Sequence, residues 1–116
     1  MNLVKLGGHL GIDPEIRYLP KGDMVVNASL ATSNDYKNRD SGEWIKKPAS
    51  WHNLVAFGKV AEELAGFAKG NKIQVEGKIM YEEWTDKSGN KRTATKIQIF
   101  KIEKQGADNE PKDVPF

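Results

Sequence analysis

Large aromatic residues recur beside lysines in this sequence, and the combination suits contact with nucleic-acid bases. In the alternating stretch "SWHNLVAF", Trp51 and Phe57 share one parity, while Leu54 and Ala56 take the other. Because every base has a π face, exposed aromatic rings can stack on bases without reading their order, and lysine ammonium groups can follow the phosphates. The pattern predicts a surface for single-stranded nucleic acid.

A second group of this kind lies in "NKIQVEGKIMYEEW", where Trp84 has the same parity as Lys72 and Lys78. The opposite parity holds the residues expected to face inward, which are Ile73, Val75, Ile79 and Tyr81. Lysines in several segments are expected to contact phosphates, namely Lys5, Lys37, Lys72 and Lys78.

Each aromatic residue also has a purely structural explanation. Trp51 and Phe57 would belong to the core if the parity were inverted, and Trp84 could cap the end of a barrel. Tyr36 and Trp44, in the polar segment that follows the second expected strand, could anchor that segment.

The elements that must position these side chains form an all-β fold with one helix. Alternation predicts strands at 4–12, 24–32, 50–57, 71–84 and 92–104. The helical period of "GKVAEELAGFAKG" predicts a helix that ends near Gly70, and Gly77 is expected to bend the fourth strand. Residues 13–23 are expected to be a turn-rich connection, and 33–50 a long hairpin or a mobile loop. Five strands with a helix between the third and fourth is the order of an OB-fold barrel.

The charge distribution divides the chain into a basic body and an acidic end. Residues 105–116 hold three of the 16 acidic and one of the 18 basic side chains, so residues 1–104 carry 17 basic against 13 acidic ones. We expect one domain over 1–104 and a short disordered tail over 105–116. The basic body favours a polyanionic partner. No apolar run approaches a membrane span, and the start has no signal-peptide pattern.

Catalytic and metal-binding motifs are missing from the sequence. It contains no P-loop, no "HExxH" and no nucleophile motif, and without cysteine it has no thiolate metal site. His52 has the inward parity, which favours a structural role or a subunit contact over catalysis. We therefore expect neither an enzyme nor a bound metal or cofactor.

Four segments resemble the bacterial and phage-type single-stranded DNA-binding proteins, in order and with few gaps over about residues 2–100. They are "GHLGIDPEIRYLPKGDMVVNASLAT", "WHNLVAFGKVAEELA", "KGNKIQVEGKI" and "WTDKSGNKR". The resemblance implies an OB-fold homotetramer that coats single-stranded DNA without sequence preference in replication, repair and recombination. It also implies a cytoplasmic, nucleoid-associated protein, or one in the host cytoplasm if it is phage-encoded.

The resemblance assigns roles to individual residues. It implies stacking by Trp51, Phe57, Trp84 and Tyr36, and it adds two lysines on the DNA path, Lys59 and Lys69. His52 matches a histidine associated with subunit assembly. The ending resembles the acidic tip that docks proteins of DNA metabolism, here formed by Asp113, Val114, Pro115 and Phe116.

Two features depart from the family pattern. Glu82 and Glu83 precede Trp84 where relatives commonly carry basic residues, and two carboxylates beside a phosphate path would repel it. The connection between body and tip is also short. Three other functions therefore stay open: an OB-fold adaptor of primosome type that acts mainly through protein contacts, an RNA-binding module and, least favoured, a nuclease.

Overall fold

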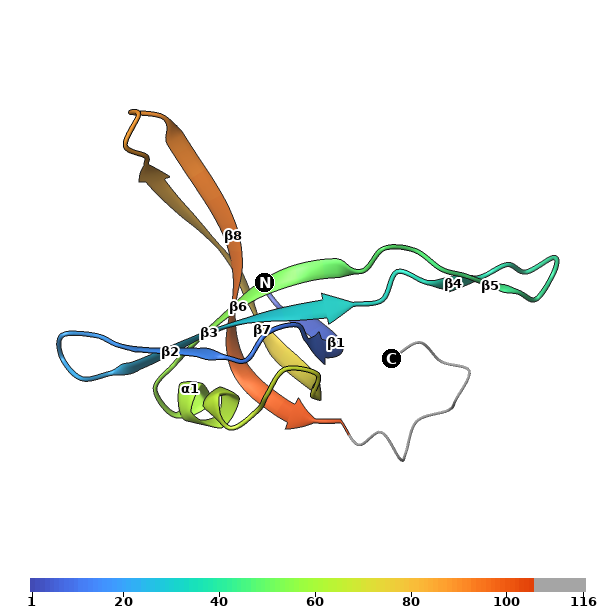
Figure 1. The fold of residues 1–116 in the computed structure, drawn as a ribbon, viewed down its shortest axis with the longest axis horizontal. Helices are drawn as coiled ribbons and strands as arrows, with labels where there is room; N and C mark the ends of the chain where they lie inside the picture. The colour runs from blue at the N-terminus through green and yellow to red at the C-terminus, as the bar shows by residue number, and fades with distance from the viewer. Residues whose placement is uncertain (106–116) are drawn as a thin grey trace.

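The computed structural model describes residues 1–105 of the chain, and its elements follow one another as a β-rich domain with a single helix (Figure 1). In chain order they are β1 (Val4–Leu10), β2 (Glu15–Tyr18), β3 (Met24–Thr32), β4 (Tyr36–Lys37), β5 (Trp44–Ile45), β6 (Ser50–Phe57), α1 (Gly58–Ala65), β7 (Lys72–Thr85) and β8 (Lys91–Lys104).

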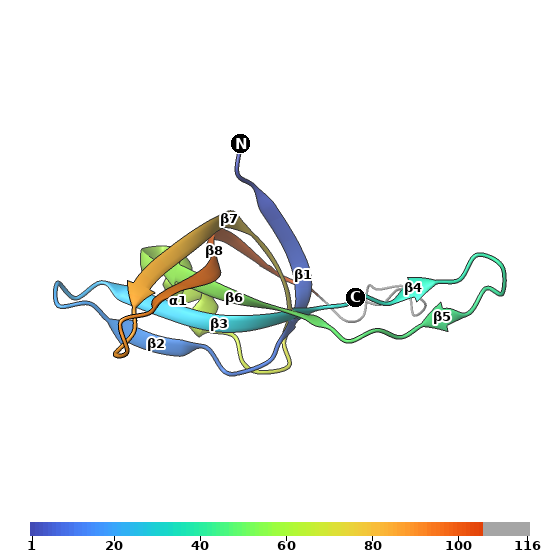
Figure 2. The same cartoon turned by 90° about the horizontal axis from the view of Figure 1, so that it is seen from above.

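The main sheet closes on itself. Its strand order is β1-β7-β8-β6-β3-β2, and a further pairing of β1 with β3 joins five strands into a ring (Figure 2). All pairings are antiparallel except the short parallel one between β6 and β8. The prediction of a five-stranded OB-fold barrel with a helix between the third and fourth barrel strands is confirmed.

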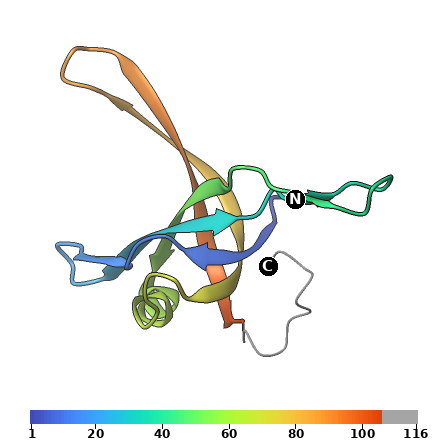
Figure 3. The ribbon, with the colours of Figure 1, turned by 45° about the vertical axis from the view of Figure 1, so that its right-hand side comes forward.

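Alternating apolar residues fill the barrel as the sequence predicts. Val26 and Leu30 of β3 and Leu54 and Ala56 of β6 are fully or almost fully buried. Leu64 of α1 is also fully buried, and the helix packs on the strands at one end of the barrel, where Figure 3 shows it almost end-on. Burial of each valine or leucine side chain contributes roughly 1.5–3 kcal/mol, so this alternation fixes which face of each strand meets solvent.

Two of the ribbons that project from the barrel carry much of the exposed aromatic surface. The distal parts of β7 and β8 form one, and β4 pairs with β5 in the other, which resolves the open question about 33–50 in favour of a hairpin (Figure 1). We call the distal β7/β8 ribbon, residues 79–97, the arm.

Three expectations about the strands and the helix were wrong. Tyr81 and Ile79 were expected inside the barrel, yet they are 68% and 36% exposed, because β7 outruns the ring and a two-stranded arm has solvent on both faces. The helix ends at Ala65, capped by Gly66, well before Gly70. The turn-rich connection contains β2, whose Ile16 pairs with Val26 of β3.

The described chain ends at Gln105, whose backbone N–H donates to the carbonyl of Lys72 at 3.0 Å. Most of the predicted tail and its whole tip, which comprises Asp113, Val114, Pro115 and Phe116, lie outside the described residues.

Candidate nucleic-acid interface

The outer face of β6 presents the two aromatic residues predicted to stack. Trp51 is 62% exposed and Phe57 is 43% exposed. In the antiparallel β3/β6 pair, Trp51 lies opposite Ala31 and Phe57 lies opposite Val25. Directly opposite residues share one face, so small side chains of β3 lie beside the large rings of β6. The predicted parity of this strand is confirmed, and the alternative that both rings belong to the core is excluded.

The same outer face continues from β6 across β8 to β7. Val55 lies beside Gln98 of β8, and Gln98 lies opposite Lys78 of β7. One more aromatic residue, Phe100, is exposed here, and sequence analysis missed it. Glu76 pairs with Lys101 and Gly77 with Ile99, so Phe100 is the extra residue of a bulge. Alternation carries no signal for such an insertion.

Trp84 stands near the tip of the arm and is 49% exposed. It lies opposite Arg92, so both side chains are on one face of the ribbon. The Arg92 Nε donates to Asp86 Oδ2 at 3.0 Å, and Asp86 Oδ1 accepts the backbone N–H groups of Ser88 and Asn90, both at 2.9 Å. Asp86 therefore braces the turn and holds a cation beside the indole.

The two acidic residues that precede Trp84 do not act together. The Glu82 carboxylate forms an ion pair with the Lys96 ammonium at 3.0 Å across the arm. Both side chains lie on the same face of the arm as Trp84. Glu83 lies opposite Thr93. Because successive residues of a strand point to opposite faces, Glu83 lies on the face opposite to that of Glu82 and Trp84. The expected repulsion from two carboxylates is thus reduced to one carboxylate with a cation beside it.

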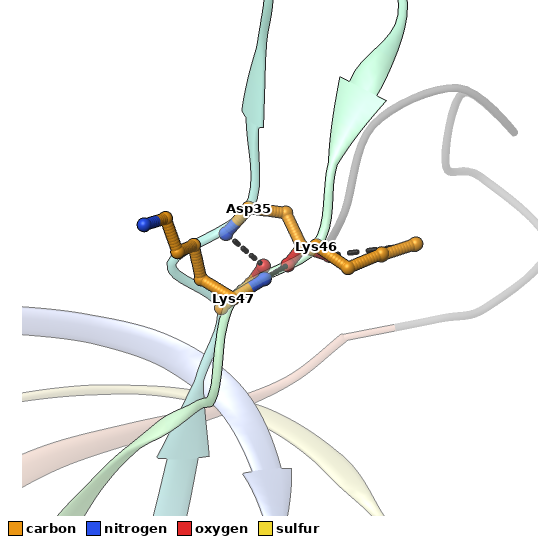
Figure 4. Close-up of polar contacts among 4 residues, drawn as sticks. Asp35, Lys46 and Lys47 are labelled. Carbon is orange, nitrogen blue, oxygen red and sulfur yellow. Dashed lines mark hydrogen bonds and ion pairs between the residues drawn. The ribbon is translucent and has the colours of Figure 1, made fainter.

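Tyr36 and Lys37 form β4 in the second ribbon, and both are exposed. The carboxylate of Asp35 ties this ribbon together at its base (Figure 4). Asp35 Oδ1 accepts the backbone N–H of Lys47 at 2.8 Å, and Oδ2 lies 3.4 Å from Lys46 Nζ. The Lys47 ammonium lies 5.9 Å from the centroid of the Tyr36 ring, within the range of a cation–π contact. A ring and three lysines are thereby grouped on one short hairpin.

The remaining predicted phosphate contacts are scattered over the barrel rather than aligned. Lys59 is exposed in the first turn of α1, two residues after Phe57, and Lys69 is exposed beyond the helix. The Lys5 ammonium lies 3.3 Å from Glu76, which also pairs with Lys101 at 3.5 Å. A phosphate would have to compete with Glu76 for Lys5, so the structure favours Lys78 and Lys59 over Lys5 as contacts.

A family model for the single-strand binding protein family matches residues 1–105. The chain belongs to the single-strand binding protein family. Its structure is also similar to that of a Plasmodium falciparum SSB in complex with ssDNA, with a TM-score of 0.79 and 24% sequence identity. That match covers 91% of this chain and 96% of the other one, and at this identity it shows the fold.

Membership of the single-strand binding protein family supports binding to single-stranded DNA rather than an enzymatic activity. Within residues 1–105 there is no group of three or more histidine or acidic side chains placed to hold a metal ion. No helix in this described part is long and apolar enough to span a membrane.

The two histidines lie on different strands, His9 on β1 and His52 on β6. His52 Nε2 lies 2.9 Å from the hydroxyl of Thr32, and its ring is half-buried. This contact fits a structural role, and the role of His52 in subunit assembly stays a prediction. His9 lies opposite Lys72, and partial burial, with a smaller effect from the Lys72 charge, lowers the pKa of His9 below its usual 6.5.

Proposed function

We propose that this member of the family coats single-stranded DNA without sequence preference during replication, repair and recombination. The observation that carries the proposal is the shared outer face of β6 and the arm, on which Trp51, Phe57 and Trp84 are all exposed. Lys78 lies on the same face, so the bases and the phosphates of one strand each find a partner.

This face suits a single strand better than a duplex. In a duplex the bases are stacked on one another, and their faces are closed to protein rings. A single strand exposes those faces, and stacking contributes roughly 1–3 kcal/mol per base, a range measured on proteins of this class. Because stacking ignores base identity, binding of this kind is tolerant of sequence.

Titration of the protein with a labelled oligo-dT, followed by anisotropy, tests the proposal. We expect Trp51→Ala and Trp84→Ala each to weaken binding by about 5- to 150-fold, which is the fold-change equivalent to roughly 1–3 kcal/mol. Tyr81→Ala is the matched control, because Tyr81 is an exposed aromatic residue of the same arm whose parity places it on the face opposite to that of Trp84. Wild-type affinity in both test variants would refute the assignment.

The ligand class is tested with the wild-type protein. A duplex of equal length should bind much more weakly than oligo-dT at the same salt. Competition between oligo-dT and oligo-U distinguishes DNA from RNA, and preference for oligo-U would favour an RNA module instead.

The finer roles belong to the same proposal. By the family resemblance, we propose a homotetramer with His52 at a subunit contact. We also propose that the protein is cytoplasmic and associated with the nucleoid, or lies in the host cytoplasm if it is encoded by a phage. Sedimentation of the wild type and His52→Ala tests the assembly.

We further propose that Asp113, Val114, Pro115 and Phe116 recruit proteins of DNA metabolism. Removal of 113–116 should abolish such recruitment and leave the affinity for oligo-dT unchanged.

A further inference from the structure

Gly11 and Trp51 meet across the outer face of the barrel. In the β1/β3 pair, Leu10 lies opposite Leu30, and the N–H of Gly11 donates to the carbonyl of Ser29 at 2.9 Å. On the other side of β3, Trp51 lies opposite Ala31. The indole therefore spans β3, over neighbouring strands about 4.8 Å apart, to reach Gly11.

The contact leaves no room for a side chain at position 11. A Cβ on Gly11 would overlap Cζ3 of the Trp51 ring and would lie 2.8 Å from Cη2 and 3.3 Å from Cε3. The residues of β3 between them, Ser29 and Ala31, are also small. The far edge of the indole thus rests against the backbone of Gly11 while 62% of the residue stays open to solvent.

We propose that Gly11 is a positioning residue for Trp51. The edge of the Trp51 ring packs against the backbone at position 11, which has no side chain. This contact fixes the orientation in which the exposed surface of the ring can stack on a base. A ring already held in its binding orientation loses less rotational freedom when a base stacks on it, so affinity rises. The part of this inference that concerns DNA rests on the proposed stacking function of Trp51.

An alanine at position 11 should move the ring and leave the fold intact. Gly11 is not among the glycines with positive φ, so alanine can adopt its backbone conformation. The atoms that would collide belong to the far end of a side chain, which can rotate. Gly8 differs, because a Cβ there would meet the backbone carbonyl of Ala31.

The test compares Gly11→Ala with Gly7→Ala. Gly7 is the matched control, because it lies in β1, the strand that Gly11 directly follows, has no positive φ, and a Cβ there would meet nothing within 4 Å. We expect Gly11→Ala to melt at or above the wild-type temperature, yet to bind oligo-dT about 3- to 10-fold more weakly, a part of the full stacking effect. Gly7→Ala should bind like the wild type. The salt dependence of binding should not change, because phosphate contacts are untouched.

Two further measurements separate the ring contact from the DNA role. With Trp44→Phe and Trp84→Phe, Trp51 is the only one of the three tryptophans left. In this background Gly11→Ala should shift the emission of the free protein, and Gly7→Ala should not. In a Trp51→Ala background, Gly11→Ala should have no further effect on binding.

The outcomes are distinct. Unchanged emission of the free protein, or an equal loss of affinity with and without the Trp51 ring, overturns the positioning role. A shifted emission together with wild-type binding by Trp51→Ala supports the ring contact and refutes the stacking function instead.

Discussion

The Lys96 ammonium lies 3.0 Å from the Glu82 carboxylate, across the arm that carries Trp84. Lys96 is the more enclosed of the two side chains, with 25% of it exposed against 46% of Glu82. The pair lies on the face that we assign to DNA, so its net charge is close to zero where two acids alone would repel phosphate.

Replacement of Lys96 by Gln should therefore do more than remove one cation. It leaves Glu82 without its partner on the DNA face, and we expect oligo-dT binding to weaken several-fold at low salt. A second change, Glu82→Gln, should restore most of that affinity. The measurement is a double-mutant cycle by anisotropy at two salt concentrations.

The control for this cycle is Glu83→Gln, which changes an acid on the opposite face of the arm. Thermal stability should barely respond in any variant, since exposed ion pairs contribute about 0.2–1 kcal/mol. If Glu83→Gln raises the affinity as much as Glu82→Gln does, the facial assignment is wrong.

The close approach of the β8 backbone to Gly77 predicts that a side chain at this position lowers the stability of the fold. A Cβ on Gly77 would meet the backbone carbonyl of Gln98, at the bulge where β7 and β8 change register. Because a main-chain atom cannot rotate away, Gly77→Ala should destabilise the barrel by about 1–3 kcal/mol, the range for overpacking. Urea denaturation would measure this loss, and Gly7→Ala, with open space around its Cβ, should stay near the wild type.

Alternation in the sequence was enough to predict most of the barrel core and the exposure of Trp51 on the outer face of β6. Val26, Leu30 and Leu54 are buried where period two places them, and Trp51 is exposed for the same reason. The signal is strong because a one-residue error would turn every apolar side chain of these strands toward solvent.

Alternation could not show where the barrel ends along a strand. Tyr81 continues the inward parity of Val75, but no further strand closes over the arm at that position. Nor could it show the pairing of Glu82 with Lys96, which depends on a cross-strand register. The extra residue Phe100 shifts that register by one, and bulges of this kind follow from sheet closure rather than from local residue pattern.

The contacts of Asp35 at the base of the β4/β5 hairpin predict that its carboxyl group titrates at an unusually low pH. The backbone N–H of Lys47, and to a smaller extent the Lys46 side chain, hold the pKa of Asp35 below its usual 3.8 against the opposing effect of burial. A lowered pKa means that the contact is intact above pH 3.8 and is lost as the pH falls through the depressed value. The amide proton of Lys47 should report this step in NMR spectra.

The expected midpoint of that titration lies below 3.8, and Asp35→Asn should abolish it while leaving the barrel resonances unchanged. Oligo-dT affinity of Asp35→Asn at neutral pH should fall modestly, because the hairpin that carries Tyr36 loses its charged tie. A midpoint at or above 3.8 would contradict the described contact.

His9 predicts a pH dependence of stability near neutrality. Partial burial, and then the charge of Lys72 on the neighbouring strand, lower the pKa of His9 below 6.5. Just below pH 6.5 the unfolded chain therefore binds more protons at this residue than the folded chain does, so the free energy of unfolding should decrease as the pH falls from 7 to 5. His9→Gln, which cannot titrate, should lose this part of the dependence. The comparison is made by urea denaturation at each pH, and parallel curves for the two proteins across this range would show that His9 is not perturbed by its position beside Lys72.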